Sequence, residues 1–230
     1  MNNIAIITAR GGSKRIPRKN IRDFCGKPIM AYSILAALES GLFNEVMVST
    51  DDQEICAIAK EYGASVPFYR SEATSNDFAG TGAVLLEVIN EYKKRGREFD
   101  FMCCIYPTAP FVTAKKLQDA YRLMIDNGVD AISPVTSFSY PPQRGFYIRE
   151  GKLVAVDPAS RPKRSQDLET IYHDVGQFYF YRMSKWNKGG VSLPLILPES
   201  EVQDIDNYED WKIAEMKYRL MIENGRGNGG

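Results

Sequence analysis

The chain has 230 residues with 29 basic and 29 acidic side chains, so its formal net charge is zero. This balance argues against a general binder of nucleic acids or membrane surfaces, because such proteins carry a basic face. The longest nearly apolar run, residues 29–38, is too short to span a bilayer, and the first residues lack a secretory-signal pattern. These features predict one large cytoplasmic domain with a substantial core.

The cysteines give no metal-binding or disulfide pattern. Cys25, Cys56, Cys103 and Cys104 form no C-x-x-C pair, and His173 is the only histidine. A zinc site with thiolate ligands is therefore not expected. We expect Cys103 and Cys104 to be core residues of a protein from a reducing compartment, and a vicinal disulfide is the less favoured alternative.

Strand-like and helix-like segments alternate through the first 135 residues. Strands are expected at residues 4–8, 45–49, 65–69, 101–106 and 131–135, and helices at residues 28–38, 51–62, 81–94 and 114–126. Apolar strands that alternate with helices predict an α/β fold whose parallel sheet is covered on both faces. Ligands of such sheets bind at the carboxyl ends of the strands.

The alternation stops after residue 134. Residues 140–163 are rich in proline and arginine and contain a hairpin-like pattern at residues 147–149 and 152–156. This pattern predicts an irregular excursion from the sheet, at about residues 138–175. An aromatic strand at 176–181, a strand at 195–197 and a helix at 208–222 are then expected. We interpret the aromatic run at residues 178–181 as core and interface packing. We expect a single domain over residues 1–222 and a disordered glycine-rich tail over residues 223–230.

A basic, glycine-containing loop follows the first strand, where residues 9–20 read ARGGSKRIPRKN. Residues 10–22 contain six cationic side chains and no acidic one. Glycines allow close approach of the backbone to a ligand, and lysine and arginine suit phosphate oxygens. The spacing fits neither a P-loop nor a dinucleotide-binding motif. We interpret the loop as a polyphosphate site, with a solvated basic loop as the alternative.

An acidic pair lies near the other end of the chain, in the sequence Asp204-Ile205-Asp206. In an extended segment the two carboxylates point to the same side, and oxygen ligands at this spacing suit Mg²⁺. The alternative is an acidic cluster that is stabilised by the dipole of the helix starting near residue 208. The pair alone leaves both readings open. The basic loop favours the metal reading, because the loop would bind the phosphates and the acidic pair would bind the metal ion that accompanies them.

Three further features each have two readings. The turn at residues 106–111 contains two prolines and could form a pocket wall or a plain strand exit. Arg70 ends the third expected strand, where it could contact a phosphate or base or lie on the surface. His173 stands beside Asp174, and a structural hydrogen bond is favoured for it over substrate contact.

Several of these segments together resemble the acylneuraminate cytidylyltransferases, which are the CMP-sugar synthetases of nine-carbon acidic sugars. The resemblance covers residues 4–218 and rests on ARGGSK at 9–14, KN at 19–20, GKP at 26–28, VSTD at 48–51, PTAP at 107–110 and DID at 204–206. It implies a three-layer, Rossmann-like nucleotidyltransferase fold and a homodimer formed through a small excursion. It also implies a Mg²⁺-dependent reaction of CTP with a 2-keto sugar acid that releases pyrophosphate.

The resemblance also implies roles for individual residues. The nucleotide-binding residues would be Ala9, Arg10, Gly11, Gly12, Ser13, Lys14, Lys19, Asn20 and Arg70. Asp204 and Asp206 would bind the metal, and Arg10, Lys14 and Asp206 would act in catalysis. The sugar contacts would be Tyr106, Thr108, Arg144 and Gln177.

Two departures from the sialic-acid members bear on the sugar. This chain has Tyr106 and Ala109 where those members have Gln and Ser, and residues 175–179 read VGQFY in place of NGAIY. The combination of YPTAPF at 106–111, YHD at 172–174 and GQFYF at 176–180 more closely resembles the members that use pseudaminic acid. The resemblance therefore favours pseudaminic acid as the sugar, with sialic or legionaminic acid as the alternative. A sugar-1-phosphate nucleotidyltransferase and a non-catalytic nucleotide sensor are the other hypotheses.

Overall fold

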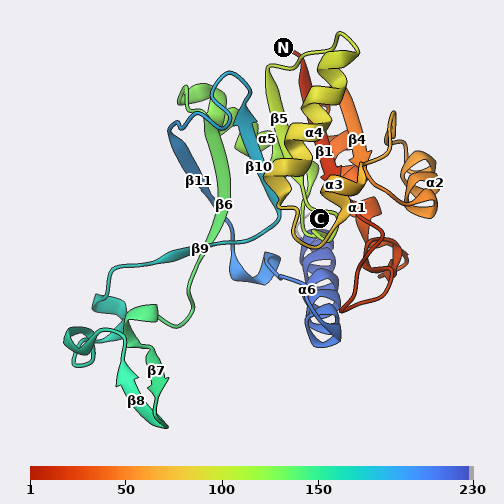
Figure 1. Cartoon of the computed structure of the whole chain (residues 1–230). Coiled ribbons are helices and arrows are strands. Elements are labelled where there is room, and N and C mark those ends of the chain that lie inside the picture. Colours follow the sequence, from red (N-terminus) through yellow and green to blue (C-terminus); the bar gives the residue numbers. More distant parts are fainter. Residues whose placement is uncertain (228–230) are drawn as a thin grey trace.

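The computed structural model describes residues 1–227, with side chains up to residue 223. Its centre is a seven-stranded sheet in the order β11-β6-β10-β5-β1-β4, with β9 paired to β6 (Figure 1). The strands are β1 (Asn3–Thr8), β4 (Glu45–Ser49), β5 (Phe101–Ile105), β6 (Ala131–Ser137), β9 (Tyr172–Asp174), β10 (Phe178–Arg182) and β11 (Ser192–Ile196). Strand β1 runs parallel to β4 and β5, and β11 runs parallel to β6. Only β9 and β10 pair antiparallel with their neighbours in this sheet. The predicted α/β fold with a mostly parallel sheet is confirmed.

Some of the described helices begin at side-chain caps. The helices are α1 (Ile29–Glu39), α2 (Gln53–Glu61), α3 (Glu72–Ser75), α4 (Thr81–Lys94), α5 (Ala114–Asp126) and α6 (Tyr208–Gly227). Short 3-10 helices lie at η1 (Lys19–Ile21), η2 (Pro142–Arg144), η3 (Pro158–Ser160), η4 (Ser165–Asp167) and η5 (Glu199–Glu201). Helix α2 begins after Asp52 and α5 after Thr113, and each of these side chains accepts a hydrogen bond from a backbone N–H of the first turn. Such N-caps satisfy backbone donors that lack a partner within the helix. No described helix has the length and apolar character needed to cross a membrane.

Alternation along β1 divides the core into two layers. Ala5 and Ile7 pack with residues of α1, α2 and α5 on one face of the sheet. Ile4 and Ile6 pack with residues of α4 on the other face. Successive side chains of a strand point to opposite faces, so one apolar strand supplies both layers. The three-layer arrangement that the resemblance implied is present. Cys103 and Cys104 are buried within β5 and free, as expected.

The expected strand at residues 65–69 is wrong. Ser65 alone bridges to Met47 of β4, through one donated and one accepted backbone hydrogen bond. Pro67 follows two residues later and has no N–H to continue the ladder, which explains the short pairing. The final helix continues to Gly227 rather than ending at residue 222. For residues 228–230, the expected disorder of the tail falls outside the described residues.

Residues 138–171, here called the arm, project from the sheet between β6 and β9 (Figure 1). A backbone hydrogen bond from Phe138 to Ile171 closes the base of the arm. The arm contains the hairpin of β7 (Phe146–Arg149) and β8 (Lys152–Ala155), in the region where the sequence predicts a hairpin-like pattern. A second small hairpin, β2 (Asp23–Phe24) with β3 (Lys27–Pro28), precedes α1.

Candidate active site

A cavity of about 400 Å³, here called the first cavity, opens where β1 and β5 end. Its lining residues are Thr8, Arg10, Ser13, Lys14, Arg15, Ile16, Lys19, Asn20, Asp77, Tyr106, Pro107 and Thr108. The basic loop therefore faces the proline-containing turn that follows β5. This is the carboxyl edge of the sheet, where ligands of parallel α/β sheets bind.

Carboxylates from distant parts of the chain neutralise the basic loop. Asp77 pairs with both Arg10, at 2.8 Å, and Lys14. Asp206 pairs with Arg15 at 2.7 Å. The loop has no acidic residue of its own, so the tertiary structure supplies these partners. A carboxylate between Arg10 and Lys14 lies where the sequence predicted phosphate oxygens.

The two loop glycines differ in what they contact. The N–H of Gly11 donates to Asp51 at 2.9 Å, and a Cβ at Gly11 would come within 2.8 Å of Asp52 Oδ2. Gly11 is thus required by close packing on the start of α2. A Cβ at Gly12 would meet no atom within 4 Å. Asn20 is buried, and its amide donates to the Arg10 carbonyl at 2.8 Å, which holds the loop together.

Five of the expected nucleotide-binding residues line the first cavity, and four do not. Those at the cavity are Arg10, Ser13, Lys14, Lys19 and Asn20. Ala9 is fully buried and Gly11 packs on Asp52, so both hold the loop in place without lining the cavity. Gly12 and Arg70 also lie outside the lining.

Arg70 is buried, so the surface reading of this residue is wrong. Its Nε donates to Ser49 Oγ at 3.1 Å and its Nη2 to the Ser49 carbonyl at 2.7 Å. Burial lowers the pKa of the Arg70 guanidinium, while Asp51 opposes this change. Arg70 thereby stabilises the end of β4, and its expected contact with the nucleotide stays a prediction.

The acidic pair lies against the basic loop. Lys19 Nζ donates to the carbonyl oxygen of Ile205 at 2.7 Å, between the two aspartates. Ile205 is 1% exposed, whereas Asp204 is exposed and Asp206 half-buried, as an extended segment with one inward side chain predicts. Burial lowers the pKa of Lys19, and Asp206 opposes this effect. Within the described residues, no cluster of three or more His, Cys, Asp or Glu side chains could hold a metal ion.

A second cavity of about 370 Å³ adjoins the first, and Tyr106 lines both. Tyr179, Tyr181 and Trp186 contribute further to its wall, between α4 and β10. The rings of Tyr106 and Tyr179 meet edge to face with centroids 5.8 Å apart. The Tyr179 hydroxyl donates to Asp174 at 2.5 Å.

Sequence reasoning missed the role of the tyrosines of β10, which we had read as core and interface packing. Phe178 and Phe180 are fully buried on one face of the sheet. Tyr179 and Tyr181 point to the other face and reach the second cavity. The signal was present in the sequence, because the hydroxyl-bearing rings alternate with the purely apolar ones at the period of a strand.

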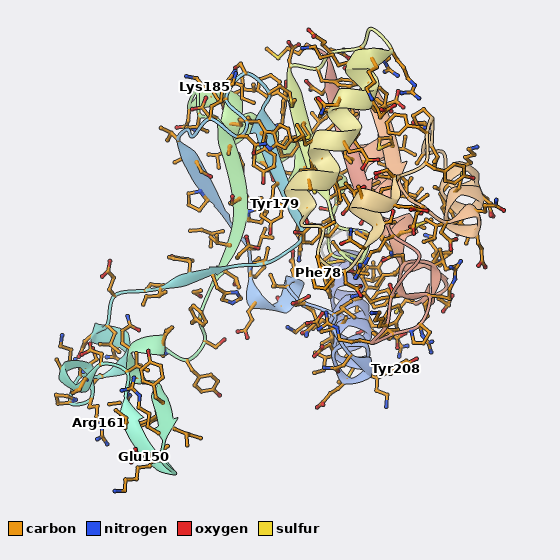
Figure 2. All side chains as sticks on the ribbon, viewed as in Figure 1. Phe78, Glu150, Arg161, Tyr179, Lys185 and Tyr208 are labelled. Carbon is orange, nitrogen blue, oxygen red and sulfur yellow. The ribbon has the colours of Figure 1, made fainter. Side chains whose placement is uncertain are left out.

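Of the four expected sugar contacts, Tyr106 and Thr108 line the first cavity, and the other two do not. Gln177 is 2% exposed and donates to the Glu201 carbonyl at 2.8 Å. Arg144 lies in the arm and donates to Ser165 at 3.0 Å. Figure 2 shows the arm residue Glu150 well separated from Phe78, the neighbour of Asp77.

His173 has structural contacts, as the sequence favoured. Its ring packs on Phe138 with centroids 4.7 Å apart, at the base of the arm. Its Nδ1 lies 2.8 Å from the carbonyl oxygen of Asp174. Neither cavity is lined by this histidine.

Comparison with known proteins agrees with this architecture. A family model described as cytidylyltransferase matches residues 4–187. A pseudaminic acid cytidylyltransferase of Campylobacter jejuni is 42% identical over 97% of this chain and 99% of its own length. A CMP-N,N'-diacetyllegionaminic acid synthase of Legionella pneumophila is 34% identical over 97% of this chain and 99% of its own length. A solved CMP-2-keto-3-deoxy-manno-octonic acid synthetase complexed with CTP has the same fold, with a TM-score of 0.68 at 18% identity over 97% of this chain and all of that one.

The sheet, the cavity at its carboxyl edge and these matches define the protein as a nucleotidyltransferase. More narrowly, the chain belongs to the cytidylyltransferase family.

Proposed function

We propose that this protein transfers CMP from CTP to the anomeric C2 hydroxyl of pseudaminic acid and releases pyrophosphate. The single observation that carries the proposal is the approach of the acidic pair to the basic loop, through Lys19 and Ile205. The 42% identity to a pseudaminic acid cytidylyltransferase supports the choice of sugar. Sialic or legionaminic acid is the alternative, since a 34% identical relative is a CMP-legionaminic acid synthase.

In this proposal the triphosphate occupies the first cavity. The cationic side chains of Arg10, Lys14 and Lys19 line it, with the polar groups of Ser13 and Asn20 beside them. Phosphate oxygens take the place of Asp77 on Arg10 and Lys14. Charge-assisted hydrogen bonds from these cations stabilise the charge that develops on the leaving pyrophosphate.

The residues present fit a magnesium ion. Asp204 and Asp206 offer only carboxylate oxygens, the hard ligands that Mg²⁺ prefers, and two protein ligands leave positions for phosphate oxygens and water. When bound, the ion supplies positive charge at the phosphates. Arg15 releases Asp206 for this role and stays close enough to contact phosphate oxygens.

The chemistry is a displacement at the α-phosphorus. The sugar hydroxyl oxygen forms a bond to phosphorus as the bond to the pyrophosphate oxygen breaks, and the hydroxyl proton passes to solvent. Such transfers depend on positioning and charge stabilisation, so no protein nucleophile is needed. The sugar would lie against Tyr106 and Thr108, with its acyl groups directed into the aromatic second cavity.

The protein acts as a homodimer in this proposal, and the arm is the contact. Apolar side chains are exposed along it, including Tyr140 at 89%, Ile148 at 78% and Leu153 at 69%. Exposed apolar patches of this kind are typical of interaction surfaces. The arm projects away from the central sheet of its own chain (Figure 1). In the dimer, the arm would therefore bring Arg144 to the sugar site of the second copy.

Residues 1–222 form one domain in this proposal, because strands on both sides of the arm join the same sheet. The cytoplasm is the proposed location. It is a reducing compartment, in which the four free cysteines would stay reduced.

The test is pyrophosphate release with CTP and Mg²⁺ across pseudaminic, N-acetylneuraminic, legionaminic and 2-keto-3-deoxyoctonic acids. We expect the highest kcat/KM with pseudaminic acid. A preference for N-acetylneuraminic acid would overturn the choice of sugar. Turnover only with sugar phosphates would indicate a sugar-1-phosphate nucleotidyltransferase, and CTP binding without any turnover would indicate a nucleotide sensor.

A further inference from the structure

Asp204 and Asp206 lie in a segment, residues 202–207, that belongs to no helix or strand. Contacts with other parts of the chain therefore hold the two carboxylates in place. Lys19 contacts the middle of the segment, at the Ile205 carbonyl, and further contacts lie at its two ends. At the downstream end, the Asp210 carboxylate accepts hydrogen bonds from the N–H groups of Asp206, at 2.9 Å, and Asn207, at 3.0 Å. The upstream end is Glu201, the last residue of η5.

Two side chains that are largely shielded from solvent hold Glu201, one from α5 and one from the turn before β10. Lys116 of α5 lies 2.6 Å from its carboxylate, and Gln177 donates to its carbonyl oxygen at 2.8 Å. The Lys116 side chain is only 12% exposed, and Gln177 is 2% exposed. The Oε1 atom of Gln177 is buried without a hydrogen-bond partner in the described structure, so its N–H bond to Glu201 orients the amide.

Lys116 also contacts the wall of the first cavity. Its ammonium donates to the carbonyl oxygen of Phe111 at 2.7 Å, at the end of the turn that supplies Pro107 and Thr108 to the cavity. One buried ammonium thus joins the cavity wall to the segment that carries the acidic pair. Without this ammonium, the Glu201 carboxylate would lose its counter-charge in a half-buried place and turn toward solvent.

We propose that Lys116 and Gln177 are positioning residues that set the distance between the Asp204 and Asp206 carboxylates and the nucleotide cavity. They touch neither nucleotide nor metal and act through Glu201. This inference rests on the proposed function, in which the acidic pair binds the metal. It assigns Gln177 a different task from the sugar contact that the sequence predicted.

The test compares Lys116→Met with Lys115→Met on the intact protein. Lys115 is the adjacent residue of α5 and its side chain is 72% exposed. Among the described residues it pairs only with Asp119 of the same helix, so it is a matched control. Mn²⁺ binding is measured by calorimetry with the protein saturated with a CTP analogue that cannot release pyrophosphate. We expect Lys116→Met to weaken Mn²⁺ binding about 10-fold to 100-fold, as loss of groups that orient metal ligands does. Lys115→Met should bind Mn²⁺ as the unmodified protein does.

The melting temperature separates positioning from simple stabilisation. A Lys116→Met protein with a lower melting temperature but unchanged Mn²⁺ binding would overturn the inference. Gln177→Met removes the donor without leaving a charge unpaired, and it should weaken Mn²⁺ binding even if Lys116→Met does not fold. Unchanged binding in a folded Gln177→Met protein would likewise count against the inference.

Asp206→Asn distinguishes the inference from the function on which it rests. Loss of Mn²⁺ binding in Asp206→Asn with normal binding in Lys116→Met would leave the metal role standing and remove the positioning role. Normal Mn²⁺ binding in Asp206→Asn would instead remove the metal role itself.

Discussion

The ammonium nitrogen of Lys19 lies 2.7 Å from the carbonyl oxygen of Ile205, a residue 186 positions further along the chain. This contact brings the end of the basic loop to the middle of the acidic pair. Lys19 lines the first cavity, and Asp206 pairs with Arg15, which also lines it. Cations with carboxylates beside them suit a nucleotide that carries a divalent ion, because phosphate oxygens bind both the cations and the ion. The proposed function depends on this relationship more than on any single motif.

Lys19→Met tests the contact directly. The change removes a cation from the first cavity and the donor that holds Ile205, so we expect kcat/KM to fall by about 10²-fold to 10³-fold, as loss of one charge-stabilising donor does. Steady-state pyrophosphate release measures the effect. Lys60→Met on α2, which lines neither cavity, is the control. A loss below threefold in Lys19→Met would contradict the role given to this ammonium.

Asp77→Asn is expected to tighten CTP binding. The Asp77 carboxylate pairs with Arg10 and Lys14, and these pairs lower the pKa of Asp77, Lys14 contributing most. The triphosphate must displace this carboxylate to reach the same cations. Because exposed ion pairs are weak, the dissociation constant for CTP should fall only by a factor of about three to ten. Calorimetric titration in low salt measures this change, and Asp119→Asn serves as the control.

Weaker CTP binding in Asp77→Asn would mean that Asp77 arranges the two cations for the nucleotide rather than competing with it. The difference between the two proteins should also shrink as salt is added, because salt screens exposed charges.

Charged substitutions in the arm should separate the subunits. Ile148 and Leu153 face each other across the β7–β8 hairpin and are 78% and 69% exposed. Ile148→Asp combined with Leu153→Asp places charge in the proposed contact, so we expect monomers in sedimentation analysis. CTP binding should persist, because the first cavity contains no arm residue. Leu220→Asp on α6, at a residue 58% exposed, is the matched control. A monomeric unmodified protein would refute the dimer.

Asp52→Asn predicts a pH-dependent loss of stability. Arg18 contacts the Asp52 carboxylate at 2.5 and 3.0 Å and is the largest cause of a pKa lowered from 3.8 to about 2. The charged form is therefore favoured in the folded state, and this stabilisation is present above about pH 4 and lost as the pH falls toward 2. Asparagine can still cap α2.

The expected loss in Asp52→Asn at pH 7 is about 1 kcal/mol of unfolding free energy. This figure is below the full value of the pKa shift because the Arg18 side chain is 39% exposed. Urea unfolding measures the difference in unfolding free energy between Asp52→Asn and the unmodified protein, and this difference should be smaller at pH 3 than at pH 7. Asp126→Asn, at an exposed residue, is the control. An equal difference at both pH values would show that the ion pair is not its source.

Most helices and strands could be predicted because their signals are local. The helix at residues 81–94 and the helix at residues 114–126 have the bounds expected from apolar periodicity. The strand at 65–69 failed because residues 65–69 have a strand-like composition but Pro67 ends the pairing after one bridge. Strand pairing needs a backbone N–H at each hydrogen-bonded position, and the overall composition of a segment does not show where one is missing.

The candidate site could be predicted only in part from such local signals. The basic loop and the acidic pair were recognisable from residue type and spacing. Gln177 was expected to contact the sugar, yet its side chain is buried. Its amide donates a hydrogen bond to the backbone carbonyl of Glu201, and the adjacent Phe178 is buried in the core. The tyrosines of β10 were assigned to packing. The alternation of phenylalanine and tyrosine along this strand distinguishes its two faces, but only the packing against α4 leaves a cavity at the tyrosine face.

For this protein, the amino-acid order alone was enough to specify the α/β class, the concentration of basic side chains in residues 9–20 and the spacing of the two aspartates. Periodicity, capping residues and glycine content act within a few turns of chain, so they can be read locally. Folding set which charges meet: Asp77 with Arg10 and Lys14, Asp206 with Arg15, and Lys116 with Glu201. Those contacts join residues more than 60 positions apart, and only the packing of helices on the sheet brings their side chains within hydrogen-bonding distance.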